Sequence, residues 1–323
     1  MSRTVTVGID GSPESLAAAA WAAREARLRA LPLRLLNVWE MVPEPMGRAP
    51  ALGAETDTNA GTEAASGTEA ASGTGVGKVL REAADGIRLR HPGVDVGVEQ
   101  LTGRASEELV KAAQEAGLLV LGSRGLSGIA GFLLGSVGLH VVAHTERPVV
   151  LVRAGERAAD EHMPGPAGAS AAGAPAAEAP FRPVVLGVDL AHPDPTLIRF
   201  ACEAAAVRRT ALRVLHVWRP PAHSGLRERP GLDADLATDL GGTAAAALSD
   251  VLRPWRLEYP SVEVVEEPRR GKAADHLLEA SRDACLVVVG RHVRRSPLGA
   301  HIGPVAHAVL HHAGVPVAVV PHG

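Results

Sequence analysis

The chain repeats itself once, and this internal repeat constrains the fold more than any other feature. Four apolar segments occur in the same order in both halves of the 323-residue sequence. The matched segments are 4–10 with 183–189, 35–39 with 214–218, 118–122 with 286–290, and 147–152 with 315–320. A shared order of this kind indicates a tandem duplication of one domain. We expect domains at 1–153 and 182–323.

Two segments fall outside the repeat. Residues 154–181 are rich in Ala, Gly and Pro, a composition typical of a flexible linker. Residues 43–75 contain Gly-Thr-Glu-Ala-Ala-Ser twice in succession and almost no large apolar side chain. Such a stretch cannot offset the entropy lost on ordering, so we predict a disordered insertion there. A mobile lid is the functional alternative for the same residues.

Each half alternates short apolar runs with stretches of helical periodicity. The runs are rich in Val and Leu and are bounded by Gly or Pro, as strands buried on both faces of a parallel sheet are. Ser12 and Pro13 are a good N-cap and first residue for a helix over 13–30, and Asp194-Pro195 repeats the device. Five strands and four helices per half predict two doubly wound α/β domains, each a five-stranded parallel sheet flanked by helices.

Composition and charge exclude several classes of function. A formal net charge of -3 does not fit a nucleic-acid-binding surface. The longest apolar stretch, around 129–143, is interrupted by glycines and a histidine and is too short to span a bilayer. Two cysteines, Cys202 and Cys285, exclude a disulfide framework and fit a reducing compartment. With no apolar signal region at the start, we expect a cytoplasmic protein without nucleic-acid or membrane partners.

A glycine-rich loop follows the fourth apolar run of the first half. Residues 122–138 contain six glycines, and a helical pattern begins at Ser136. Ligands of open parallel sheets bind beyond the carboxyl ends of the strands, where bare main-chain N–H groups and a helix N-terminus can cradle a phosphate. Alternatively, the glycines only shape a tight connection. Gly77-Lys78 lacks a following hydroxyl and no G-x-G-x-x-G follows the first strand, so neither a P-loop ATPase nor an ordinary dinucleotide fold is supported.

Other candidate groups assign no chemistry. His307 and His311 are one helical turn apart and could ligate zinc, but no third ligand follows at helical spacing. His140 and His144 repeat the spacing in the first half, which favours a shared helix surface. No nucleophile elbow G-x-S-x-G is present, and both cysteines lie in apolar surroundings typical of the core. We therefore assign no catalytic residue and no metal site.

The spacing Gly122-x2-Gly125-x9-Gly135-Ser136 resembles the nucleotide-binding pattern of universal stress proteins. Asp10 at the first strand end, the Asn37-Val38 strand end and Pro148 before the last strand also fit. The similarity covers nearly all of both halves outside the insertion and the linker. The chain thus resembles a tandem-domain universal stress protein. That resemblance implies two Rossmann-like (adenine nucleotide alpha hydrolase-like) domains with strand order 3-2-1-4-5.

The resemblance also implies how ATP would be held. The expected cofactor-binding residues are Asp10, Val38, Gly122, Arg124, Gly125, Gly135, Ser136 and Val137. The loop residues and Val137 would contact phosphates and ribose through N–H groups, helped by the Ser136 hydroxyl. Val38 would contact adenine, and Asp10 would hold the nucleotide directly or through Mg²⁺. Arg124 would pair with phosphate oxygens, or else is a solvated loop arginine.

The second half departs from the pattern. Its loop keeps the spacing from Gly290 to Gly303, but Val293 and Pro304 replace the middle glycine and the serine. Val293 resists positive φ, and Pro304 supplies neither a hydroxyl nor an N–H. Three arginines of this loop could still attract an anion: Arg291, Arg294 and Arg295. We predict that the first half binds ATP and that the second binds it poorly or not at all.

These features favour an ATP-binding regulatory module of a stress response, with hydrolysis absent or slow because no general base is evident. An ATP-hydrolysing enzyme and a nucleotide-independent, partner-binding scaffold remain as alternatives. The last strands, 148–152 and 316–320, would lie at exposed sheet edges that need covering. The resemblance suggests that these strands pair across a two-fold axis. We expect an intrachain pseudo-dimer of the two domains and, in addition, a homodimer of chains.

Overall fold

A computed structural model describes residues 4–40, 69–123, 135–164, 179–219, 232–293 and 302–323. The first half contains β1 Val5–Gly8, α1 Pro13–Arg29, β2 Leu33–Trp39, α2 Glu69–Arg90, β3 Val96–Thr102, α3 Ala105–Glu115, β4 Leu118–Ser123, α4 Ser136–His144 and β5 Val149–Arg153. The second contains β6 Val184–Gly187, α5 Pro195–Arg208, β7 Leu212–Trp218, α6 Leu232–Glu258, β8 Val264–Arg270, α7 Ala273–Ser281, β9 Leu286–His292, α8 Pro304–His312 and β10 Val317–His322. A short 3₁₀ helix, η1 (Ala158–Glu161), lies between them.

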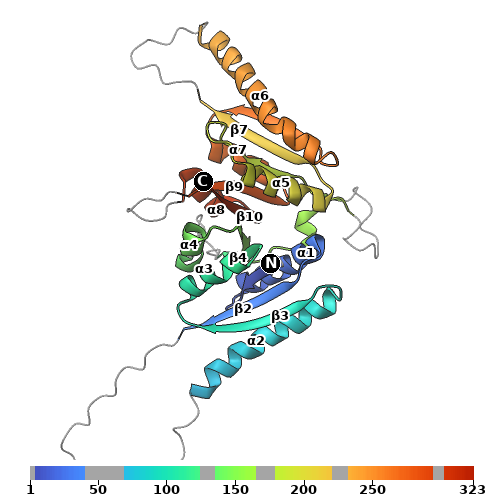
Figure 1. Ribbon diagram of the computed structural model, residues 1–323, viewed down its shortest axis with the longest axis vertical. Helices are drawn as coiled ribbons and strands as arrows, with labels where there is room; N and C mark the ends of the chain where they lie inside the picture. The colour runs from blue at the N-terminus through green and yellow to red at the C-terminus, as the bar shows by residue number, and fades with distance from the viewer. Residues whose placement is uncertain (1–3, 41–68, 124–134, 165–178, 220–231, 294–301) are drawn as a thin grey trace, which may run out of the picture.

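All ten strands join in one sheet, in the order β3-β2-β1-β4-β5-β10-β9-β6-β7-β8 (Figure 1). Within each half the pairs are parallel, and the order 3-2-1-4-5 is the expected one. The two halves meet where β5 and β10 pair antiparallel, with Val150 opposite Ala318. The predicted fold class and the predicted pseudo-dimer are therefore confirmed. Because the central pair is antiparallel, the carboxyl ends of the strands of the two halves point in opposite directions.

Helix capping works as the sequence predicts. The Ser12 side chain accepts a hydrogen bond from the Ser15 N–H, and Pro13 opens α1. In the second half, Asp194 accepts from the N–H groups of Thr196 and Leu197 and Pro195 opens α5. These caps satisfy donors that have no partner inside the helix. Each helix therefore starts immediately beyond the strand that precedes it.

The helices form two layers, one on each face of the sheet, and both layers continue across the boundary between the halves. Helices α1, α2, α5 and α6 bury one apolar cluster against the sheet. Helices α3, α4, α7 and α8 bury the other. Cys202 and Cys285 are both buried, which confirms their predicted place in the core. Among the described residues, no helix is both long enough and apolar enough to cross a membrane.

A buried ion pair joins α1 to α5 across the boundary. Glu25 is 1% exposed, and its carboxylate accepts from Arg208 Nη2 at 2.5 Å and from Arg29 Nε at 2.6 Å. Burial alone would raise the pKa of Glu25, but the guanidinium groups of Arg208 and Arg29 lower that pKa to about 2. This pair is a direct side-chain contact between the two halves, and removing one partner would leave the other as an uncompensated buried charge.

The structure corrects two boundaries. Residues 41–68 of the expected insertion lie outside the described residues, but α2 begins at Glu69, so the end of the insertion is helical. The start of the predicted flexible linker is anchored, because Glu156 and Glu161 accept from Arg24 at 2.5 and 2.7 Å. Composition alone could not reveal these contacts, because the partner of both glutamates, Arg24, lies in α1.

Candidate functional site

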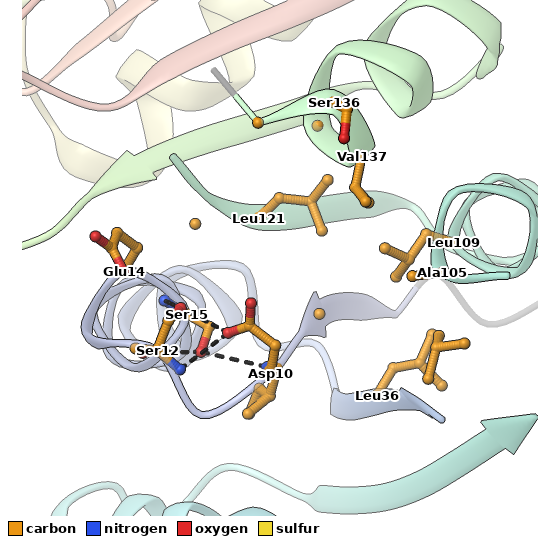
Figure 2. Close-up of a pocket in the computed structure, with 16 residues that line it drawn as sticks. Asp10, Ser12, Glu14, Ser15, Leu36, Ala105, Leu109, Leu121, Ser136 and Val137 are labelled. Carbon is orange, nitrogen blue, oxygen red and sulfur yellow. Dashed lines mark hydrogen bonds between the residues drawn. The ribbon is translucent and has the colours of Figure 1, made fainter. Parts of the chain in front are cut away.

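The first half has a pocket of about 220 Å³ at the carboxyl ends of β1, β2 and β4 (Figure 2). Six predicted site residues line this pocket: Asp10, Val38, Gly122, Gly135, Ser136 and Val137. The two others, Arg124 and Gly125, lie outside the described residues. Figure 2 shows Asp10, Ser12 and Ser15 on one side of the pocket and Ser136 and Val137 on the other. The fold thus brings together residues that are more than 120 positions apart in the sequence.

The N-terminus of α4 opens onto this pocket. Gly135 is its N-cap, in an extended conformation (φ -59°, ψ 153°), and no side chain caps the helix. The first main-chain bond of the helix runs from Leu139 N–H to the Gly135 oxygen at 3.0 Å. The N–H groups of Ser136, Val137 and Gly138 precede it and have no acceptor inside the helix. Three donors and the positive end of a helix dipole therefore face the pocket.

Two of the three predicted site glycines, Gly122 and Gly135, lie in the described residues, and they differ in what surrounds their Cα atoms. A Cβ on Gly122 would lie 2.6 Å from the main-chain carbon of Glu14, so this glycine lets the start of α1 pack against the end of β4. A Cβ on Gly135 would meet no atom of the described residues within 4 Å, and its φ of -59° is open to any residue. Packing among the described residues therefore explains Gly122 but not Gly135.

The opposite wall of the pocket is polar and acidic. Asp10 Oδ1 accepts from the Ser12 N–H at 2.9 Å and from the Ser12 hydroxyl at 2.5 Å. Ser15 Oγ accepts from the Asp10 N–H at 3.4 Å and donates to the Ser12 main-chain oxygen at 2.9 Å. Glu14 adds a second carboxylate to the lining. The β1–α1 turn therefore fixes Asp10 at the pocket edge next to hydroxyl groups.

Sequence reasoning missed several lining residues. These are Gly8, Ile9, Ser12, Glu14, Ser15, Leu36, Ala105, Leu109, Leu121 and Gly138. The position of Ser12 and Ser15 directly after the first strand is a signal that could have identified them. Ala105 and Leu109 come from the start of α3, and no local pattern marks them as lining residues. The apolar members make part of the pocket suitable for a flat, weakly polar group.

The second half has its own pocket, of about 680 Å³, at the carboxyl ends of β6, β7 and β9. Its lining includes Asp189 and Asp194 together with four histidines: His192, His216, His292 and His322. The first main-chain bond of α8 joins His307 N–H to the Gly303 oxygen at 2.9 Å. Since Pro304 has no N–H, only Val305 and Ala306 offer donors at this helix start. The second helix terminus thus has fewer donors and no hydroxyl.

The expectation that Arg291 attracts an anion is wrong. Arg291 is 3% exposed and does not line the second pocket. Its Nη2 donates instead to the main-chain oxygen of Thr145, at the C-terminus of α4. The partner belongs to the other half of the chain, so the local loop pattern gave no sign of it. Arg294 and Arg295 lie outside the described residues.

The rings of the two remaining histidine pairs lie close together, each pair on its own helix. The ring centroids of His140 and His144 are 4.0 Å apart, and those of His307 and His311 are 4.3 Å apart. Across the described ranges, no three His, Cys, Asp or Glu side chains are grouped so that they could hold a metal ion. Burial raises the pKa of Cys202 and of Cys285 to about 12, which makes both thiols poor nucleophiles.

Comparison with known proteins gives the same assignment for both halves. A family model described as "Universal stress protein family" matches residues 1–153 and 180–321. A universal stress protein of Mycolicibacterium smegmatis is 28% identical over 321 residues, covering 98% of this chain and 96% of the relative. One of Mycobacterium tuberculosis is 30% identical over 322 residues, covering 98% and 95%. The crystal structure of a universal stress protein from Archaeoglobus fulgidus has the same fold, with a TM-score of 0.64, 17% identity and full coverage of both chains.

Proposed function

Because this chain belongs to the universal stress protein family, we propose that its first half binds ATP and that the nucleotide regulates the protein during a stress response. The single observation that carries the proposal is the open start of α4 above the first pocket. Its N–H groups at Ser136, Val137 and Gly138 and the Ser136 hydroxyl suit phosphate oxygens. The open space beside Gly135 leaves room for a phosphate close to the main chain.

The apolar part of the same pocket suits the adenine ring. Val38 lies half-buried at the end of β2, beside the lining residues Leu36 and Ile9. A purine buries apolar faces and needs few polar contacts to be held. In this arrangement the base lies against β2, the ribose lies near the end of β1, and the phosphates point to α4.

The acidic wall of the pocket suits a nucleotide that carries Mg²⁺. Asp10 and Glu14 would repel a bare triphosphate, and a divalent cation between them and the phosphates removes that repulsion. Mg²⁺ in nucleotide sites takes most ligands from phosphates and water, with one or two carboxylates from the protein. Asp10, fixed by Ser12, is the residue that we propose for this role.

We propose a binding and regulatory role with hydrolysis that is slow at most. Among the described lining residues there is no Lys or Arg to stabilise a transferring phosphoryl group. The Oδ1 atom of Asp10 already accepts two hydrogen bonds from Ser12. We also propose that the protein forms a homodimer of chains and acts in the cytoplasm.

One matched pair of variants tests the proposed site. Gly135→Asp places a carboxylate where no atom of the described residues lies within 4 Å of the new Cβ, so the fold should tolerate it while phosphate is repelled. Gly303→Asp makes the same change at the equivalent open position of the second half. Calorimetric titration with Mg-ATP should show binding in the wild type and in Gly303→Asp and none in Gly135→Asp.

The same titration decides between the alternatives. Equal binding by both variants would remove the first pocket as the site. No binding by the wild type would favour the nucleotide-independent scaffold. Release of radiolabelled phosphate well above background, and lost in Gly135→Asp, would favour an ATP-hydrolysing enzyme.

A further inference from the structure

The second half contacts the helix that forms the first site. Arg291 lies in β9 between Gly290 and His292, which both line the second pocket. Its side chain reaches α4 of the first half, where Nη2 donates to the main-chain oxygen of Thr145. Thr145 is the C-cap of α4 and is itself 1% exposed. The opposite end of this helix opens onto the first pocket, so Arg291 and the pocket lie at the two ends of one short helix.

The positive charge of Arg291 stabilises the C-terminus of α4. The last carbonyl groups of a helix carry partial negative charge and have no partner inside it, so a cation there is stabilising. Burial lowers the pKa of Arg291 while the carboxylate of Glu146 raises it. A guanidinium taken out of water needs hydrogen-bonded partners, and the C-terminus of α4 supplies one. Because burying this charge without a partner is unfavourable, the hydrogen bond to the C-terminus of α4 stabilises Arg291 in this position.

The equivalent position of the first half makes no such contact. Gly122 and Gly290 correspond, so Ser123 stands where Arg291 stands in the second half. The Ser123 hydroxyl donates to the Val152 oxygen of the adjacent strand at 3.3 Å and stays within its own half. The exchange of a serine for an arginine therefore creates a contact between the halves that the repeat itself does not require. The first half reaches α8 from another position, where Arg153 Nη2 donates to the His311 oxygen at 3.1 Å.

We propose that Arg291 is a positioning residue for the phosphate end of the nucleotide site in the first half. The helix α4 has nine residues, a length of about 13 Å at 1.5 Å per residue. Holding its C-terminus fixes the direction of its axis, and with it the direction of the N–H groups at Ser136, Val137 and Gly138. This inference rests on the proposed nucleotide site. It assigns a residue of the second half, whose own helix start carries Pro304 in place of the serine, to the site of the first half.

The test compares ATP with adenosine. Arg291→Met keeps much of the side-chain volume and removes the charge, so the core should stay filled. We expect the affinity for Mg-ATP to fall about tenfold and the affinity for adenosine to stay unchanged, because only phosphates meet the start of α4. Arg291→Lys keeps the cation and should recover part of the lost affinity. Equal losses for ATP and adenosine, or no loss for ATP, would overturn the proposal.

A second readout needs no nucleotide. Main-chain hydrogen exchange of α4 in the unliganded, full-length protein should be at least about tenfold faster in Arg291→Met than in the wild type. The matched control is Arg182→Met, because Arg182 Nη1 donates at 3.0 Å to the main-chain oxygen of Arg282, the C-cap of α7 in the second half. That control should leave both α4 exchange and ATP affinity unchanged. If the wild type binds no ATP, the proposed function fails, whereas unchanged α4 exchange in Arg291→Met would overturn the positioning role by itself.

Discussion

The two halves share a backbone plan and differ in the chemistry at the start of their last helices. Both α4 and α8 follow a glycine with φ -59°, and both open onto a pocket. The first helix offers three N–H groups and the Ser136 hydroxyl, whereas Pro304 leaves the second with two N–H groups. The comparison teaches that a helix terminus alone does not specify a ligand. The single residue after the N-cap changes both the number and the kind of donors.

Residues in and beside the two pockets also differ between the halves. Asn37 Nδ2 donates to the Ile9 oxygen at 2.7 Å in the first half, and His216 Nδ1 makes the equivalent contact to the Val188 oxygen at 3.2 Å in the second. The contact is kept, but an imidazole ring replaces the amide. His192, His292 and His322 also line the second pocket, while the described lining of the first contains no histidine. The second half has thus kept the fold and exchanged the chemistry.

The largest effect is expected where the halves are joined. Glu25→Gln should lower the free energy of unfolding by about 3–5 kcal/mol, because it leaves Arg208 as a buried charge without its carboxylate. Urea denaturation at pH 7 measures this loss. Asp250→Asn, which removes an exposed ion pair with Arg253, is the matched control and should cost at most about 1 kcal/mol.

The pH dependence of the same pair has a definite sign. The pKa of Glu25 is lowered to about 2, so its contribution is complete above the unfolded value near 4.5 and is lost as the pH falls toward 2. Acid denaturation of the wild type should show this loss, and Glu25→Gln should show less of it. If the two halves unfolded independently and Glu25→Gln had no effect on their stability, the ion pair would not couple the two halves.

Exchanging the residues after the N-caps should reduce the difference between the halves. Ser136→Pro removes one N–H and one hydroxyl from the first site, and proline is well tolerated at the first helical position. Two hydrogen bonds to a charged group are worth roughly 3 kcal/mol together, so ATP affinity should fall about 100-fold. Calorimetry measures it, with Pro304→Ser as the control that leaves first-site affinity unchanged. Unaltered ATP binding by Ser136→Pro would show that this terminus does not hold the phosphates.

A smaller effect is expected from magnesium on the affinity of the first pocket for ATP. Removal of Mg²⁺ with a chelator should weaken ATP binding about tenfold, because Asp10 and Glu14 then face uncompensated phosphates. Glu14→Gln removes one of these charges and should make binding less dependent on Mg²⁺. Titrations of both proteins with and without the ion measure the difference. An equal dependence in the two proteins would remove Glu14 from the electrostatic explanation.

The smallest expected effect concerns the second pocket. Burial lowers the pKa of His322, an effect that His292 and Arg291 increase and that Asp194 and Asp189 oppose. The folded state therefore disfavours the charged ring, so stability should rise as the pH increases through the unfolded value near 6.5. An NMR titration of the histidine ring protons should give His322 a pKa below that value. His322→Asn should weaken the pH dependence of unfolding and leave first-site ATP affinity unchanged.

Local patterns predicted much of the fold and part of the site. Ser12-Pro13 and Asp194-Pro195 act through hydrogen bonds to residues two or three positions away, so the sequence shows them directly. Likewise, the repeat of apolar runs predicted two copies of one α/β domain, whereas the strand order came from the family resemblance. The strand-end rule predicted where Asp10 and Ser136 meet.

Contacts between distant elements could not be predicted in the same way. The partner of Arg291 is a main-chain oxygen 146 residues away, and main-chain oxygens carry no sequence signal. Glu156 and Glu161 lie in a stretch whose composition resembles a linker, yet both pair with Arg24 of α1. The sizes of the two pockets depend on side chains from several elements at once. These features follow from the assembled sheet rather than from any single segment.

The most direct test of the difference between the halves is the number of nucleotides bound by each chain. Equilibrium dialysis of the full-length protein with radiolabelled Mg-ATP, at saturation, gives this number for the wild type and for Gly135→Asp. We expect one ATP per chain in the wild type and none in Gly135→Asp. Two ATP molecules per wild-type chain, or one retained by Gly135→Asp, would contradict the assignment of the site to the first half.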